Sequence, residues 1–219
     1  MIKILRILSY PLLILGIVVV APEFWAALKI LFVSLGVYKW FFIGMGAFFV
    51  LRIIPFLGRN SRVLETASHE ITHMVLCLLF FKQVRSMKIS SEGSGEVWHS
   101  GNGIGNTFIA LAPYTLPLFT FIILIFSIWG SAESMHVFHL LIGFSLAFHL
   151  VCFATQTSLR QTDITSQGVL RSFLYIALFL MFNLAIVLLS VKNGFTDAIV
   201  SVCRGMWENF MEIFFSLNS

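Results

Sequence analysis

Two histidines and a glutamate stand close together in the chain, as His69, Glu70 and His73 within the sequence HEITH. Residues four apart on an α-helix share one face, so both imidazoles can reach a single metal ion. Zinc lowers the pKa of a bound water to about 7, and the adjacent carboxylate can take its proton. The resulting hydroxide would attack a peptide carbonyl. The motif therefore predicts a zinc-dependent hydrolase in which Glu70 is the catalytic base.

The two histidines do not complete a catalytic zinc site, which usually has three protein ligands and one open position. Asp163 is our first choice for the third ligand, because it lies in the polar segment 155–168 and is one of two aspartates in the chain. His149, which stands in an apolar run, is the alternative. On one continuous helix these two residues would lie about 21 Å apart, so a single zinc ion could not use both.

The elements that must position these residues are expected to lie in lipid. Of the 219 residues, 58% are hydrophobic and 11% are charged, whereas about a quarter of the residues of a soluble domain are charged. We expect an all-α polytopic membrane protein that forms one membrane-embedded domain over residues 1–219, with its core at 60–190. A membrane helix needs about 20 apolar residues. About six segments qualify: 4–21, 38–57, 63–81, 105–129, 135–157 and 170–191.

Two further apolar segments are expected to lie at the membrane surface. Residues 24–37 are apolar but short and include Lys29, which favours a re-entrant or interfacial helix. Residues 196–217 form an amphipathic pattern that is typical of an interfacial helix. One face of that pattern carries Ile199, Cys203, Met206, Phe210 and Phe214.

A polar segment after the HEITH helix has the pattern of a β-hairpin. Residues 84–90 read as a strand, 92–95 as a turn and 96–99 as the returning strand.

The charge and cysteine content exclude several other classes. The net charge is +4, and most Lys and Arg residues lie in short segments between apolar runs, where they would contact anionic lipid headgroups. No basic stripe with interleaved aromatic residues is present, so we expect no nucleic-acid partner. The three cysteines lie far apart in apolar sequence and form neither a disulfide framework nor a metal motif.

Three features together resemble the site-2 protease family of intramembrane zinc metalloproteases. They are HEITH on an apolar helix, the hairpin pattern at 84–99, and a later lone aspartate in QTDITSQG around Asp163. The resemblance covers roughly residues 60–190. The family's usual LDG-type aspartate motif is altered, because Ile164 and Thr165 follow Asp163 and the glycine comes only at Gly168. There is no room for a PDZ domain, so the chain resembles a small, divergent member.

The resemblance implies a zinc metalloendopeptidase, with Zn²⁺ as cofactor, that cleaves a transmembrane or membrane-proximal bond in regulated intramembrane proteolysis. A substrate strand would add to the hairpin edge at Val84, Ser86, Lys88 and Ser90. The implied partners are a transmembrane protein substrate, the lipid bilayer and membrane partner subunits. The implied location is a multi-pass position in a bacterial cytoplasmic membrane.

Two other functions compete with proteolysis. The first is a non-catalytic membrane assembly or binding subunit with a protease-like fold, which the altered aspartate motif favours. The second is a transporter or channel whose intramembrane His and Glu residues bind ions. The sequence shows no internal repeat of the kind that many transporters have, which argues against the second.

Overall fold

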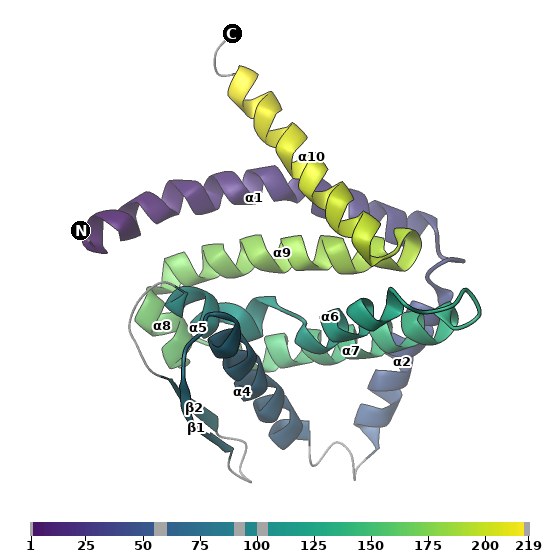
Figure 1. Cartoon of the computed structure of the whole chain (residues 1–219), viewed down its shortest axis with the longest axis horizontal. Helices are drawn as coiled ribbons and strands as arrows, with labels where there is room; N and C mark the ends of the chain where they lie inside the picture. The colour runs from purple at the N-terminus through teal and green to yellow at the C-terminus, as the bar shows by residue number, and fades with distance from the viewer. Residues whose placement is uncertain (1, 55–60, 90–94, 100–104, 217–219) are drawn as a thin grey trace.

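The structure is a computed structural model that describes residues 2–54, 61–89, 95–99 and 105–216. Within these residues the fold is helical apart from one two-stranded hairpin (Figure 1), as expected from the sequence. In chain order the elements are α1 (Ile2–Val33), α2 (Lys39–Ile53), α4 (Ser61–Leu79), β1 (Val84–Ile89), β2 (Gly95–His99), α5 (Asn106–Thr115), α6 (Leu118–Ser127), α7 (Met135–Gln156), α8 (Thr162–Gln167), α9 (Val169–Asn193) and α10 (Phe195–Ser216).

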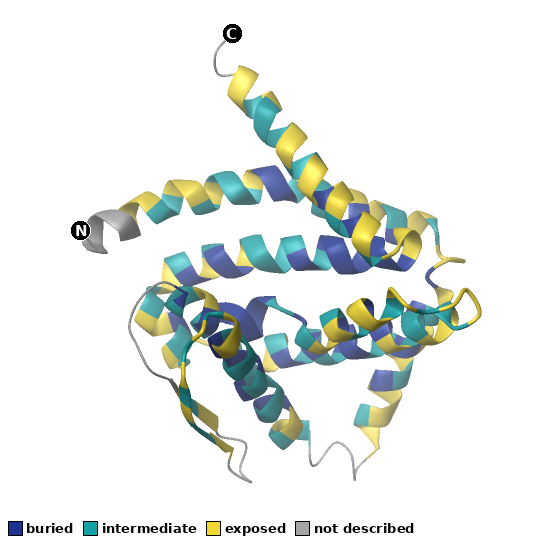
Figure 2. Ribbon diagram, viewed as in Figure 1, coloured by how far each residue is buried: buried dark blue, intermediate teal, exposed yellow. Residues whose placement is uncertain are grey.

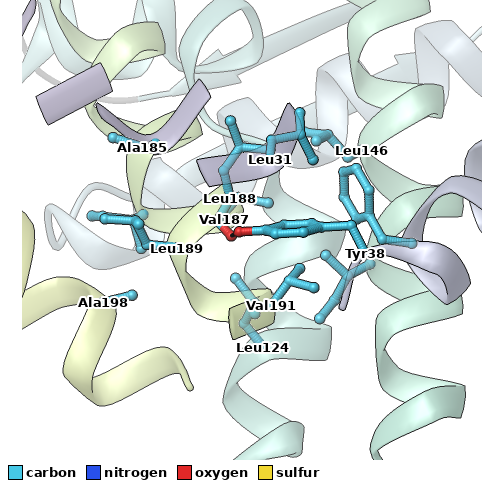
Figure 3. Packing of buried hydrophobic residues seen from close by; sticks show 14 of the residues in the cluster. Leu31, Tyr38, Leu124, Leu146, Ala185, Val187, Leu188, Leu189, Val191 and Ala198 are labelled. Atoms are coloured by element: carbon cyan, nitrogen blue, oxygen red, sulfur yellow. Dashed lines mark hydrogen bonds between the residues drawn. The ribbon is translucent and has the colours of Figure 1, made fainter. Parts of the chain in front are cut away.

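Helix α9 is the centre of the molecule. It contacts α1 and α10 on one side and α5, α6 and α8 on the other (Figure 1). Its second half is almost fully buried and packs into the largest apolar cluster (Figure 3). The hydroxyl of buried Tyr38, between α1 and α2, donates a hydrogen bond to the Leu188 carbonyl at 2.8 Å. This bond fixes the start of α2 against α9.

In the described part of the chain, three helices are long and apolar enough to cross a membrane: Ile7–Val33 in α1, Met135–Gln156 in α7 and Val169–Asn193 in α9. Helices α5 and α6 make a fourth if the bent pair counts as one span. These helices support a membrane protein, but the six spans expected from the sequence are not confirmed.

The two remaining segments fall short for physical reasons. Helix α2 has 15 residues in the described part of the chain, fewer than the roughly 20 that a span needs. Helix α4 carries Arg62, Glu65 and Glu70 among its 19 residues. The polar residues of HEITH add to Arg62 and Glu65, so α4 is less apolar than the helices that are long and apolar enough to span a membrane.

The N-terminal apolar sequence forms one helix where a span at 4–21 and a separate helix at 24–37 were expected. Helix α1 runs without a break to Val33, with Pro11 and Pro22 inside it. Membrane helices tolerate proline because local adjustments satisfy the carbonyl that loses its donor. Many side chains on α1 are exposed (Figure 2), as expected for a lipid-facing helix.

Helix α10 packs on α1 and α9, and part of the predicted apolar face takes part, since Ile199 and Met206 pack against the buried cluster. Ala198 and Val202 are fully buried, whereas Cys203 is exposed. The Asn209 side-chain amide donates to the Val19 carbonyl at 3.1 Å and joins α10 to α1. Beyond this contact the end of α10 projects from the bundle (Figure 1).

Helices α2 and α7 cross at two glycines. A Cβ atom at Gly44 would lie 1.9 Å from the Leu140 carbonyl oxygen, and one at Gly143 would lie 1.9 Å from the Phe41 carbonyl oxygen. The two backbones are therefore in contact, as is common where membrane helices meet at small residues.

The predicted span at 105–129 is broken into α5 and α6, which are bent by 80°. Pro117 follows the last turn of α5 and cannot supply an N–H to continue it. The Thr115 carbonyl, near the end of α5, accepts a hydrogen bond from the Asn183 side chain at 2.9 Å. Helix α9 thereby satisfies a carbonyl that the break exposes.

The two strands pair antiparallel, with Val84 opposite His99 and Ile89 opposite Gly95. The predicted hairpin is thus present, with an irregular register between Val84 and Ser86. Most of the predicted turn, and Ser90, lie outside the described residues.

Candidate metal centre

His69 and His73 lie one turn apart on α4 and face the interior. Their ring centroids are 4.7 Å apart, and the side chains are only 9% and 10% exposed. The i, i+4 spacing places them on one face of the helix. The HEITH sequence therefore produces the paired, buried imidazoles that the sequence predicts.

The Nδ1 atom of each imidazole, on the side away from Asp163, has a hydrogen-bond partner. His69 Nδ1 lies 2.9 Å from the Gln156 side-chain oxygen, at the end of α7. His73 Nδ1 lies 2.8 Å from the Ile109 carbonyl oxygen in α5. Oxygen atoms of amides accept hydrogen bonds, so Nδ1 of each ring carries the hydrogen and donates it. The Nε2 atoms are left to face the interior of the site.

Asp163 meets both Nε2 atoms with one oxygen. Its Oδ2 lies 3.2 Å from His69 Nε2 and 3.3 Å from His73 Nε2. Burial raises the pKa of the Asp163 carboxyl, but the two neighbouring histidines outweigh burial and hold its pKa below the usual range. The Tyr114 hydroxyl also donates to Oδ2, at 3.3 Å.

These distances fit zinc. Ligand atoms at the usual 2.0–2.2 Å from a tetrahedral zinc ion lie about 3.3 Å from one another, which is the separation between Asp163 Oδ2 and each Nε2. The ligand atoms of His69, His73 and Asp163 all lie within 4.8 Å of one another. Two imidazoles and one carboxylate would leave the fourth position open, as catalytic zinc requires.

Glu70 lies beside this group in a cavity of about 330 Å³. The residue is buried on α4 and lies next to Gly95, the first residue of β2. Helices α4, α5 and α8 and strand β2 form the walls, with lining residues His69, Glu70, His73, Gly95, Glu96, Val97, Trp98, Ile109, Ala110, Gln161, Thr162 and Asp163. The cavity thus brings a carboxylate, the candidate ligands and a strand backbone together.

The model of one protein family, described as peptidase M50B-like, matches residues 40–176. The match covers more than half of the chain. The chain belongs to the peptidase M50B-like family. This assignment confirms the resemblance to site-2 proteases drawn from the sequence. The matched region runs from α2 into α9 and includes HEITH and Asp163. No curated protein and no solved structure matches the chain.

In this M50B-like chain the two alternatives for a third ligand lie on different sides of His69. Asp163 faces Nε2, whereas His149 lines a small cavity on the Nδ1 side together with Gln156. His149 is not part of the candidate ligand group among the described residues. A break between α7 and α8 turns the chain at residues 157–161 and carries Asp163 back to α4.

The predicted substrate edge lies away from the cavity. Val84, Ser86 and Lys88 belong to β1, and none of them is among the lining residues. Strand β2 lines the cavity instead, from Gly95 to Trp98. The alternation of residue types predicts the hairpin, but it does not show which strand lines the cavity, since both strands contact α4.

Sequence reasoning missed the partners of the ligands. Gln156 lies in the polar segment that contains Asp163, so its position was a usable signal. Tyr114 lies in a proline-containing apolar run to which no role was assigned. The Ile109 carbonyl has no side-chain signal at all, because a backbone acceptor can belong to any residue.

Proposed function

We propose that this M50B-like protein is an intramembrane zinc metalloendopeptidase that cleaves a transmembrane or membrane-proximal peptide bond. The observation that carries the proposal is the convergence of His69 Nε2, His73 Nε2 and Asp163 Oδ2 in a cavity that Glu70 also lines. M50 proteins are typically zinc-dependent, and the donor set here suits that ion.

The chemistry divides between the ion and the protein. Zinc held by these atoms would supply Lewis acidity, which polarises a peptide carbonyl and makes water a better nucleophile at neutral pH. Glu70 accepts the proton of the attacking water and passes it to the nitrogen of the leaving group. The buried position of Glu70 at the cavity wall suits this role, because the carboxylate is not surrounded by bulk water.

The hairpin provides a way to hold the substrate. The described sheet has only two strands, so the second edge of β2 is not paired with another strand there. An extended peptide can add to such an edge through main-chain hydrogen bonds. We place the substrate on β2, which lines the cavity, and not on the predicted β1 edge. A transmembrane helix would have to unwind locally to bind in this way.

The proposal includes a multi-pass protein, which the apolar helices α1, α7 and α9 support. The bacterial cytoplasmic membrane and the membrane partner subunits remain predictions from the sequence.

Glu70→Gln tests the proposal. The variant should bind one zinc per chain, as measured by elemental analysis of the purified protein. It should not cleave single-span reporter proteins that the wild type cleaves in the same liposomes. Glu208→Gln, an equivalent change at an exposed position on α10, is the control and should retain full activity. Full cleavage by Glu70→Gln would refute the catalytic assignment. A wild-type protein that lacks zinc and still binds its membrane partner would favour the non-catalytic assembly subunit.

A further inference from the structure

We propose that Gln156 and Pro113 are positioning residues of the metal centre, each fixing one of the two imidazoles through its Nδ1 side. The inference rests on the proposed zinc site and adds to it. Neither residue lines the cavity that contains Glu70. Each acts instead through a histidine or through the acceptor that a histidine uses.

Pro113 acts through the Ile109 carbonyl. In an α-helix the carbonyl of residue 109 would accept the N–H of residue 113, but proline has no N–H. Pro113 lies inside α5, so this one carbonyl has no helical donor. At the two ends of α5, Ile109 donates to the Gly105 carbonyl and Leu116 donates to the Ala112 carbonyl. Proline at position 113 thus leaves the Ile109 carbonyl available to a donor from outside the helix.

His73 supplies the missing donor. Ile109 is 2% exposed, so its carbonyl would be costly to leave without a partner. His73 Nδ1 occupies it at 2.8 Å. The proline therefore makes available a buried backbone acceptor at the position where the second histidine of HEITH needs one. This explains a proline within a helix at the centre of the fold.

The end of α7 that carries Gln156 also contacts α4 through the preceding residue. The preceding residue, Thr155, donates its hydroxyl to Glu65 at 3.1 Å. Glu65 lies one turn before His69 on α4 and is paired with Arg52 at 2.6 Å. Adjacent residues at the end of α7 thus contact α4 at two points one helical turn apart. These contacts hold the end of α7 against α4, next to the Gln156 oxygen that meets His69 Nδ1.

Together the two contacts set which nitrogen faces the ion. With Nδ1 donating to an oxygen, Nε2 is the atom that can offer a lone pair, and the ring cannot flip without losing a buried hydrogen bond. Acceptors of this kind also raise the basicity of a ligating imidazole, and their removal typically lowers metal affinity by about 10- to 100-fold. We expect this range for loss of the Gln156 oxygen.

The test for Gln156 compares two substitutions of similar size in the full-length protein. Gln156→Met removes the oxygen, whereas Gln156→Glu keeps an acceptor. Zinc affinity is measured by competition with a chromophoric chelator, and ligand geometry by the visible absorption of the cobalt-substituted protein. Gln156→Met should bind zinc about 10- to 100-fold more weakly with an altered cobalt spectrum. Gln156→Glu should restore both. Equal affinity of the methionine and glutamate variants, whether unchanged or reduced, would overturn the role of Gln156.

The test for Pro113 separates positioning from stability. Pro113→Ala restores an N–H that competes for the Ile109 carbonyl, so zinc affinity should fall by about tenfold, the lower end of the range. The melting temperature of the zinc-free protein should stay the same or rise, because proline is unfavourable inside a helix. Pro22→Ala, the same change inside α1, is the matched control and should leave zinc affinity unchanged. Unchanged affinity in Pro113→Ala would overturn the inference for this residue.

The two proposals fail in different ways. A wild-type protein that binds no zinc or cobalt would contradict the proposed function and this inference together. A wild-type protein that binds zinc, with Gln156→Met and Pro113→Ala binding equally well, would contradict the positioning role alone.

Discussion

Gly95 at the start of β2 lies directly against the side chain of Glu70. A Cβ atom at residue 95 would lie 2.6 Å from both Cγ and Oε1 of Glu70, and 2.7 Å from Cγ2 of Thr66. The hairpin thus approaches the proposed catalytic base as closely as a backbone can. Only glycine permits this approach without a shift of the strand or of the carboxylate.

Gly95→Val should therefore impair cleavage while leaving the zinc content unchanged. The new side chain displaces Glu70 or the substrate-binding strand, and a misplacement of about 1 Å can reduce the rate by about 100-fold. Cleavage of a reporter in liposomes and elemental analysis provide the two measurements. Gly36→Val is the control, because no atom lies within 4 Å of a Cβ there. Wild-type cleavage by Gly95→Val would show that the hairpin can move away at no cost.

Asp163→Asn should abolish high-affinity zinc binding, whereas His149→Leu should not. The carboxylate faces both Nε2 atoms, and His149 lies on the opposite side of His69. Loss of a ligand charge should weaken binding by more than the roughly 100-fold seen for outer partners of a ligand. Chelator competition measures both affinities. The reverse pattern would identify His149 as the third ligand.

Gly44→Ala should destabilise the protein by about 3 kcal/mol. The added methyl group would overlap the Leu140 carbonyl oxygen, so α2 or α7 would have to shift. Gly46→Ala, two residues further along α2, is a matched control with no atom within 4 Å of the added Cβ. Thermal unfolding in detergent compares the two variants. Similar melting temperatures would mean that α2 and α7 are less tightly packed than the structure indicates.

Arg52→Leu should destabilise the contact between α2, α4 and α7. It leaves the buried Glu65 carboxylate with Thr155 but without its cation. Removing one partner of a fully buried pair costs about 3–5 kcal/mol. Because Arg52 is 30% exposed, we expect a smaller loss of about 2 kcal/mol. The double variant Arg52→Leu/Glu65→Leu should recover part of this loss in the same unfolding assay. A double variant less stable than Arg52→Leu would argue against an unpaired charge as the cause.

The local parts of the fold and site follow from the sequence. The spacing of His69 and His73 requires a helix face, and the alternation at 84–99 requires a hairpin, so both could be predicted without knowledge of the tertiary structure. Asp163 was placed by its rarity and by resemblance, and the structure brings it to the two imidazoles.

The parts that depend on distant contacts could not be predicted. The hydropathy of residues 105–129 predicts one continuous span. The break near Pro117 depends on Asn183, which satisfies the exposed carbonyl from a distant helix, and hydropathy contains no information about that contact. It also cannot show that Pro22 is accommodated within α1. The acceptors Gln156 and Ile109 lie 87 and 36 residues from their histidines, and no local pattern records such pairings.

Because Asp163 lies on α8, the proposed ligand set depends on a part of the chain that is synthesised well after α4. The carboxylate and His69 are 94 residues apart in the chain, and the residues described between α4 and α8 form two strands and three helices. A nascent chain that has delivered α4 to the membrane still lacks the residue that completes the proposed ligand set. A zinc-dependent activity at this site would therefore be absent until that residue has been added. The proposed ligand set would be complete only once α8 has emerged and folded back onto α4.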